Sequence, residues 1–381
     1  MKIVTIIGAR PQFIKAAAVS RSIAAHIAAR NDQQSSISEI IVHTGQHFDA
    51  NMSDIFFEEM DIPKPDYHLA INSLSHGAMT GRMLEKIEEV LLKEKPDYVL
   101  VYGDTNSTLA GALAARKLHI KVVHVEAGLR SFNMNMPEEI NRILTDRISD
   151  ILCCPTETAV KNLVAEGFQN SDKLLSANSV PLVVNTGDVM YDAALHYSTF
   201  SAERSTVMKG LNLKGRKFVL CTIHRAENTD DPDRLKSIFR ALVEINKDMR
   251  VVVPLHPRTR NILTTVFSGS DALAIINDAL TLLDPVGYFD MVELLKHATM
   301  VMTDSGGLQK EAYFFGKPCI TLRDETEWVE LVDNGFNILA SADYMRILAC
   351  FQEMSSKTVD VDRALYGTGD ASNKILNLFL H

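Results

Sequence analysis

The chain alternates short apolar runs with longer amphipathic segments, and this alternation restricts its fold more than any other feature. In the first half the apolar runs are KIVTIIG (2–8), EIIVHT (39–44), DYVLVYG (97–103), KVVHV (121–125) and ILCCP (151–155). Buried strands joined by crossover helices form a parallel sheet that is covered on both faces. The first half is therefore predicted to be a doubly wound α/β domain.

The same alternation begins again in the second half, in the runs KFVLCTIH (217–224), MRVVVPLHP (249–257), TMVMTDSGG (299–307) and KPCITLR (317–323). The predicted fold class is α/β, with two doubly wound Rossmann-like domains that face a cleft. The expected divisions are an N-terminal domain (1–185), a C-terminal domain (186–365) and a terminal helix (366–381) that packs back on the N-terminal domain. Ligands of such sheets bind beyond the carboxyl ends of the strands, so the cleft is the predicted site.

Composition argues against several classes of protein. The 39 Lys and Arg residues are outnumbered by 48 Asp and Glu residues, which gives a net charge of -9 and argues against a nucleic-acid binder. No apolar run has the length of a membrane span. The five cysteines lack the spacing of metal ligands or of a disulfide framework. We expect buried thiols, no metal and a cytoplasmic location.

Three carboxylates lie at predicted strand ends: Asp104 follows VLVYG, Glu126 follows VVHV, and Glu138 begins the helix after MNMP. Each has a structural alternative, because Asp104 could cap a helix and Glu138 suits a first helical turn after proline. For Glu138 alone that alternative is favoured. For three acids at neighbouring strand ends, acid–base catalysis is favoured, because crowded carboxylates in general raise one another's pKa and then divide into an acid and a base.

Cations and glycines at other strand ends predict an anion site. The turn GARPQFIK (8–15) has neither a G-x-G-x-x-G nor a Walker pattern, which argues against dinucleotide or triphosphate binding. TDSGGLQKEA (303–312) ends a strand with glycines before a helix, where backbone N–H groups can approach a phosphate. This signal is weak alone, but TIHRAEN (222–228) and PLHPRTR (254–260) strengthen it. A diphosphate site is therefore favoured, although His256 could equally be a hydrogen-bonded core histidine.

Seven segments together resemble the non-hydrolysing UDP-N-acetylglucosamine 2-epimerases over nearly the whole chain: GARPQFIKAA, YGDTNSTLAG, HVEAGLRS, MPEEINR, TIHRAEN, PLHPRTR and TDSGGLQKEA with GKP. The resemblance implies a GT-B-like pair of Rossmann domains, usually dimeric, that binds a UDP-sugar without a cofactor. It also implies inversion at C2 by elimination and re-addition of UDP, in the supply of cell-surface polysaccharide such as lipopolysaccharide.

The resemblance also implies roles for individual residues. The implied catalytic residues are Asp104, Glu126, Glu138 and His224, the last acting on the diphosphate. The implied substrate-binding residues are Arg10, Lys15, Arg142, His256, Val286, Met291, Ser305, Gly306, Gly307, Glu311 and Arg323. Among these, Glu311 would accept the ribose hydroxyls. The only expected partners are the UDP-sugar, UDP and a second copy of the chain.

Some positions depart from the usual family pattern. The chain has RPQFIK where many members have RPEAIK, Trp328 in DETEWVE (324–330) replaces an arginine, and Val286 replaces a glutamine. These features, with RSFNMNMPEE, are more similar to the branch that acts on UDP-2,3-diacetamido-2,3-dideoxyglucuronate. A glycosyltransferase of the same architecture, a hydrolysing epimerase and a sugar-nucleotide sensor are the alternatives. The first and the last would not need three carboxylates, and the second would release free UDP.

Overall fold

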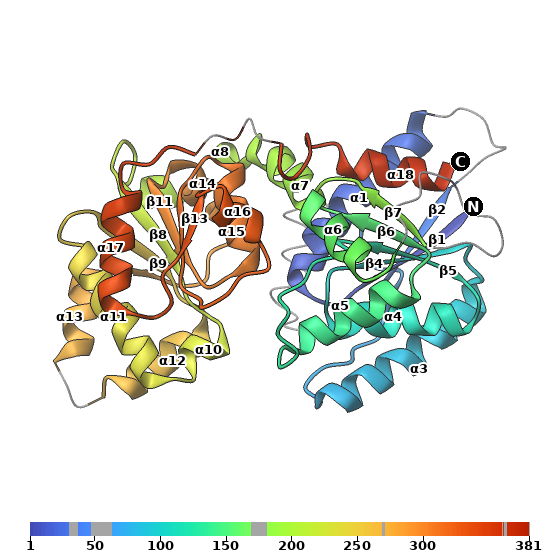
Figure 1. Ribbon diagram of the computed structural model, residues 1–381, viewed down its shortest axis with the longest axis horizontal. Coiled ribbons are helices and arrows are strands. Elements are labelled where there is room, and N and C mark those ends of the chain that lie inside the picture. Colours follow the sequence, from blue (N-terminus) through green and yellow to red (C-terminus); the bar gives the residue numbers. More distant parts are fainter. Residues whose placement is uncertain are drawn as a thin grey trace. The chain divides into compact units, whose positions relative to one another are not determined.

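The computed structural model describes residues 1–29, 37–46, 63–168, 181–268, 271–359, 361 and 364–380. These form two compact units, which are shown in Figure 1. Unit 1 comprises Met1–Leu195 and Ala364–His381, and unit 2 comprises His196–Arg363. The division differs from the expected one because residues 186–195 and 364–365 belong to unit 1. The physical reason is Asp192, whose carboxylate accepts the N–H groups of Ala371 and Ser372 at 3.2 and 2.8 Å and so anchors the C-terminal helix.

The sheet of unit 1 is parallel throughout, in the order β3-β2-β1-β4-β5-β6-β7. Its strands are β1 (Lys2–Ile7), β2 (Ser38–His43), β3 (Tyr67–His68), β4 (Tyr98–Tyr102), β5 (Lys121–Val125), β6 (Ile151–Cys154) and β7 (Leu182–Asn185). The strand order reverses between β1 and β4, because β2 and β3 add on one side of β1 and β5 to β7 add on the other side of β4. Doubly wound sheets bind ligands at such a switch point. The short strands β3 and β7 were not predicted.

Helices cover both faces of this sheet (Figure 1). The helices of unit 1 are α1 (Arg10–Ala29), α3 (His76–Glu94), α4 (Asn106–Lys117), α5 (Pro137–Ile148), α6 (Glu157–Ala165) and α18 (Ala371–Leu380), and α7 (Val189–Ser198) begins in unit 1 and ends in unit 2. Helix α4 packs between α3 and α5, over a core that includes Val4 and Ile6 of β1. Helix α18 packs against α1, and the Phe379 ring meets the Tyr98 ring edge-on at 5.1 Å.

Unit 2 repeats the architecture in a parallel sheet of order β10-β9-β8-β11-β12-β13. Its strands are β8 (Phe218–Thr222), β9 (Arg250–Pro254), β10 (Thr281–Leu283), β11 (Met300–Thr303), β12 (Cys319–Thr321) and β13 (Asn337–Leu339). The order reverses between β8 and β11, so the segments after these two strands lie at the switch point of this unit.

The helices of unit 2 pack around two hydrophobic clusters. They are α8 (Ser201–Arg204), α9 (Val207–Gly210), α10 (Ala226–Thr229), α11 (Pro232–Ile245), α12 (Pro257–Val266), α13 (Ala272–Ala279), α14 (Tyr288–His297), α15 (Gly306–Phe314), α16 (Val329–Asp333) and α17 (Tyr344–Met354). The longest of these, α11, is capped by Asp231, whose carboxylate accepts the N–H groups of Asp233 and Arg234. Pro232 follows at the first helical position, as is typical of a helix start.

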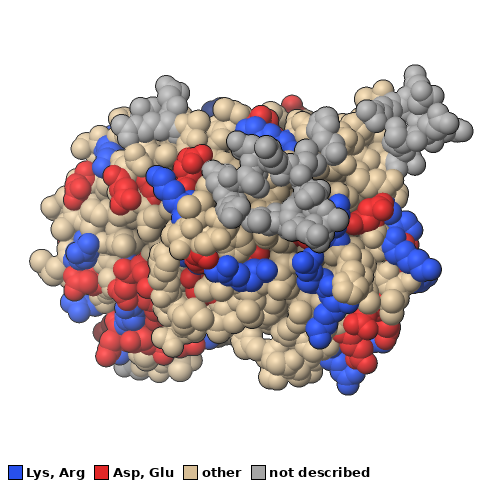
Figure 2. All heavy atoms as spheres, turned by 45° about the vertical axis from the view of Figure 1, so that its right-hand side comes forward, with Lys and Arg blue, Asp and Glu red and all other residues tan. Residues whose placement is uncertain are grey.

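On the face that Figure 2 shows, outside the grey residues, acidic and basic side chains are interspersed rather than gathered by sign. In the described part of the chain, no helix is both long and apolar enough to cross a membrane. All five cysteines are free and buried, which confirms the prediction of buried thiols.

Candidate active site

Glu126 follows β5 with a strained backbone, since its φ of +74° is unusual for a residue with a side chain. Its carboxylate lies 2.5 Å from the ammonium of Lys15 on α1, and both side chains are about one-tenth exposed or less, at 9% and 10%. Gly103 leaves room for this lysine, because a Cβ there would lie 3.2 Å from Lys15 Nζ. A strained, buried acid at a sheet's ligand edge is a mark of a functional site.

Asp104 follows β4 and is paired with Arg142 of α5 at 2.6 Å. The structural alternative for Asp104 is wrong, because the residue that caps α4 is Thr105. The Thr105 hydroxyl accepts the Thr108 N–H, and the Thr108 hydroxyl accepts the Thr105 N–H. The Asp104 carboxylate therefore does not cap the helix; it lies at the edge of the sheet, and its side chain is 31% exposed.

The carboxylates contact cations, and this differs from the crowding of acids that the sequence suggested. Lys15 faces Glu126 and Arg142 faces Asp104. Both cations were assigned to the nucleotide by resemblance. In the structure each binds the carboxylate of a candidate catalytic acid.

Glu138 and Glu139 have different surroundings in the first turn of α5. Glu138 is half-buried after Pro137, as its first-turn interpretation expects. Glu139 is wholly buried and accepts the N–H groups of Ser131 and Phe132, and it also binds Arg142 at 2.9 Å. Sequence reasoning missed Glu139, although its position three residues before Arg142 on a helix could have indicated the ion pair.

The turn between β1 and α1 is filled by a side chain of the protein itself. The Gln12 carbonyl accepts the N–H groups of Gly8 and Ala9 at 2.8 and 3.0 Å. Its amide nitrogen donates to the Tyr102 carbonyl and to the Thr108 hydroxyl at 2.7 and 2.9 Å. These backbone N–H groups are therefore not offered to a phosphate. A carboxylate at position 12 could not make the two donations, which gives the glutamine of RPQFIK a physical reason. Gln12 was not predicted.

In unit 2, the wholly buried Asp304 after β11 organises the segment after β8. Its carboxylate accepts the N–H groups of His224 and Arg225 at 3.0–3.1 Å and lies 3.2 Å from His224 Nδ1. Burial by itself would raise the pKa of Asp304, but the contacts with His224, Arg225 and Asn228 outweigh it and lower the pKa. With Nδ1 held by a carboxylate, His224 can present Nε2 to a ligand, and its ring is about half exposed.

Ser305 caps α15, and its hydroxyl accepts the Leu308 N–H at 3.5 Å. The two glycines that follow differ. A Cβ on the buried Gly306 would lie 2.2 Å from Glu327 Oε1, whereas a Cβ on the exposed Gly307 would meet only Ser305 Oγ at 4.0 Å. A Cβ on Gly306 would displace the Glu327 carboxylate, which binds Arg323, whereas the open position of Gly307 fits an incoming anion at a helix N-terminus.

We expect the two glycines to respond differently to alanine. Gly306→Ala should lower the free energy of unfolding by about 1–3 kcal/mol, because the methyl group overpacks against Glu327. Gly307→Ala should leave stability intact, but its methyl group would stand where the anion binds and raise the Kd for UDP about tenfold, an effect of the size of one lost hydrogen bond. Thermal melts and UDP titration calorimetry check the pair. Equal melting temperatures with unchanged UDP affinities would contradict both assignments.

The other predicted residues of unit 2 lie around these elements. His256 is exposed and caps α12 through Nδ1, which accepts the Arg258 N–H at 3.3 Å, so the alternative of a core histidine is wrong. Partial burial, with His224 and Arg258 nearby, lowers the pKa of His256. Arg323 is buried and pairs with Glu327 at 2.9 Å. The remaining predicted residues are Val286 and Met291 beside a hydrophobic cluster and the buried Glu311.

Not every predicted residue can be placed. The backbone of Arg10 begins α1, but its side chain lies outside the described part of the structure. Of the other predicted site residues, unit 1 brings together Lys15, Glu126, Asp104 and Arg142 through two ion pairs, with Glu138 at the start of α5.

Residues 29–380 match the family model for UDP-N-acetylglucosamine 2-epimerase. The chain is 56% identical over 376 residues, 98% of each chain, to UDP-2,3-diacetamido-2,3-dideoxy-D-glucuronate 2-epimerase of Pseudomonas aeruginosa. It is 41% identical to UDP-N-acetylglucosamine 2-epimerase of Methanocaldococcus jannaschii, over 100% of this chain and 99% of the relative.

Two solved structures are similar over the whole chain. A crystal structure of the Methanocaldococcus jannaschii UDP-GlcNAc 2-epimerase with UDP-GlcNAc and UDP has a TM-score of 0.85 at 40% identity, covering 100% of this chain and 99% of the other. The Neisseria meningitidis UDP-GlcNAc 2-epimerase bound to UDP-GlcNAc has a TM-score of 0.83 at 31% identity, covering 100% of each.

The fold and the strand-end acids thus define a sugar-nucleotide isomerase with a GT-B-like pair of Rossmann-like units. The chain belongs to the UDP-N-acetylglucosamine 2-epimerase family. It is accordingly an epimerase that acts at C2 of a UDP-linked sugar.

Proposed function

We propose that the chain inverts C2 of UDP-2,3-diacetamido-2,3-dideoxy-D-glucuronate. The observation that carries this proposal is the 56% identity, over 98% of both chains, to the Pseudomonas aeruginosa epimerase with that name. Identity to the UDP-N-acetylglucosamine epimerases of two methanogens is lower, at 42% and 41%. The proposed sugar differs from N-acetylglucosamine in its carboxylate and in its second acetamido group.

The proposed reaction is elimination followed by re-addition. A base takes the proton from C2, a double bond forms between C1 and C2, and the C1–O bond breaks with its electron pair going to UDP. In the return step a UDP oxygen bonds to C1, and C2 receives a proton on the opposite face. The chemistry therefore needs one base, one acid and positive charge near the departing diphosphate.

The described contacts support a division of these roles. The carboxylates of Glu126 and Asp104 lie at neighbouring strand ends, each bound by a cation, and with Glu138 they are the candidates for proton transfer at C2. His224, anchored by Asp304, and the start of α15 are the candidates for binding the diphosphate. A homodimer, which the family resemblance implies, is part of the proposal.

Proton NMR of the reaction in deuterated water tests the proposal on both sugars. We expect deuterium at C2 of the product, because the abstracted proton exchanges with solvent before return. We also expect faster turnover of the diacetamido-glucuronate than of UDP-N-acetylglucosamine. Product that keeps its original C2 hydrogen would contradict elimination. Preference for UDP-N-acetylglucosamine would contradict the proposed substrate alone, and free UDP accumulating in step with consumed sugar would indicate a hydrolysing enzyme.

A further inference from the structure

A buried histidine beside the candidate acids has no role in the reaction as described so far. His124 lies in β5, two residues before Glu126, and its side chain has no exposed surface. Its Nε2 lies 2.7 Å from the carbonyl oxygen of Gly103, the residue before Asp104. Its Nδ1 lies 2.7 Å from a carboxylate oxygen of Asp146 on α5. One ring therefore joins the strand end that carries Asp104 to helix α5.

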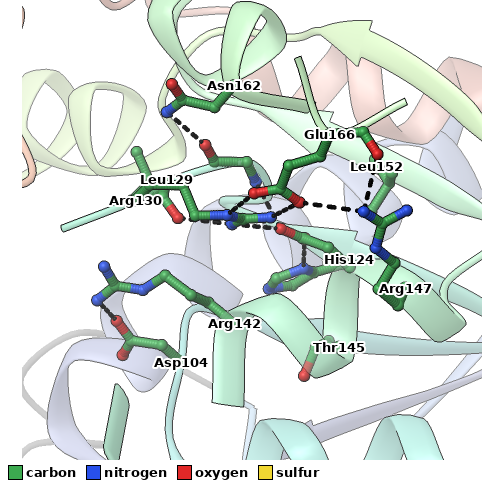
Figure 3. Close-up of polar contacts among 12 residues, drawn as sticks. Asp104, His124, Leu129, Arg130, Arg142, Thr145, Arg147, Leu152, Asn162 and Glu166 are labelled. Atoms are coloured by element: carbon green, nitrogen blue, oxygen red, sulfur yellow. Dashed lines mark hydrogen bonds and ion pairs between the residues drawn. The ribbon is translucent and has the colours of Figure 1, made fainter. Parts of the chain in front are cut away.

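Asp146 extends this connection to the loop that carries Glu126. Its second oxygen accepts the N–H of Gly128 at 3.1 Å and a guanidinium N–H of Arg130 at 2.7 Å. Arg130 in turn binds Glu166 through two N–H groups, at 2.5 and 2.9 Å, and donates to the Leu129 carbonyl at 2.6 Å. Figure 3 shows Arg130 between these acceptors, with His124 beneath it.

The partners of the ring engage both of its nitrogens. A carbonyl oxygen can only accept, so Nε2 must carry a hydrogen. Asp146 is surrounded by donors: burial acts to raise its pKa, but the contacts with His124 and Arg130 outweigh burial and lower it. The Nδ1 side of the ring bonds the Asp146 carboxylate, so both ring nitrogens are engaged in hydrogen bonds.

We propose that His124 is a positioning residue for the epimerase reaction: through its two ring nitrogens it holds the Gly103 carbonyl and the Asp146 carboxylate together and so fixes Asp104 relative to Glu126. The inference rests on the proposed function for its kinetic consequence, but the state of the ring does not depend on it.

The geometry explains why such a device is needed. Glu126 has a positive φ and is paired with Lys15, and Asp104 is paired with Arg142. Ion pairs hold the two side chains, but each loop also needs its backbone fixed, because a misplacement of about 1 Å can slow a reaction about a hundredfold. His124 and Asp146 link the two loops, because His124 contacts the Gly103 carbonyl in one loop and Asp146 accepts the Gly128 N–H in the other.

The first test reads the ring directly in the wild-type protein. Nitrogen-15 NMR of histidine-labelled protein should show one histidine whose hydrogen-bonded ring N–H is protected from exchange with solvent, as expected of a ring with no exposed surface. The signal is assigned by its loss in His124→Asn. A wild-type spectrum without such a histidine overturns the proposal. This measurement needs no substrate. If neither sugar is turned over, the proposed function is contradicted, but the result for His124 still holds.

The second test reads positioning. His124→Asn should lower kcat for C2 exchange about a hundredfold while KM and UDP affinity stay close to the wild type. Thr145→Val is the matched control, because Thr145 is buried on α5 beside Asp146 and its hydroxyl has no partner among the described residues. It should retain the wild-type kcat. If His124→Asn lowers the melting temperature but keeps kcat per folded molecule, His124 is only structural and the proposal fails.

Discussion

Replacing Glu126 with glutamine is expected to lower kcat by roughly a hundred- to ten-thousand-fold, the usual contribution of a general acid or base. The change keeps the shape of the side chain and removes its charge, so a proton can no longer be taken up or returned at this position. UDP binding should persist, because its candidate residues, His224 and the start of α15, belong to unit 2. Initial rates of C2 deuterium exchange and UDP titration calorimetry measure the two quantities.

The Glu126 variant needs two controls. Glu157→Gln removes an exposed carboxylate from the first turn of α6 in the same unit and should leave kcat unchanged. The substitution also removes the ion-pair partner of Lys15 and could destabilise the fold. Circular dichroism therefore measures the folded fraction of the variant. A folded Glu126→Gln enzyme with wild-type turnover would show that the ion pair with Lys15 is structural and that another carboxylate carries the chemistry.

Replacing Arg130 with alanine is expected to lower the free energy of unfolding by about 3–5 kcal/mol, the usual cost of breaking a buried ion pair. The Arg130 side chain is 1% exposed and binds both Asp146 and Glu166. Without it, the wholly buried Asp146 keeps its charge but loses a cationic partner. Urea denaturation followed by circular dichroism measures the effect, with the transition of unit 1 compared between variants.

Arg147→Ala is the matched control for Arg130→Ala, because Arg147 also binds Glu166 but is 49% exposed. Exposed ion pairs contribute about 0–1 kcal/mol, so this variant should unfold close to the wild type. Equal shifts of the two denaturation midpoints would show that burial does not set the strength of the Arg130 contacts. They would also weaken the argument that Asp146 is held as an anion.

The positions of the acids could be predicted from the sequence because they depend on local pattern. Strand and helix alternation indicated five strands of unit 1, and Glu126 and Asp104 follow two of them directly. The parallel sheet then requires that these strand ends share an edge. The family resemblance rests on the same local segments, and the match over residues 29–380 confirms it.

Side-chain partners could not be predicted in this way. Lys15 was expected at a nucleotide, and the structure pairs it with Glu126, more than a hundred residues away in the chain. Nothing in RPQFIK indicated that Gln12 occupies the first turn, because its four contacts lie in that turn, in β4 and in α4. The fold brings these groups together in space, and their spacing in the sequence does not indicate which groups will meet.

The sequence by itself therefore determined the two α/β units and the strand ends at which the acids lie, because periodicity and turn residues act over a few positions of the chain. Only the tertiary structure decided which cation faces which acid, and that His124 contacts both Gly103 and Asp146. The physical reason is the order of the sheet. Strands β1, β4 and β5 are neighbours in space although β2 and β3 intervene along the chain, and hydrogen bonds and ion pairs depend on distance in space.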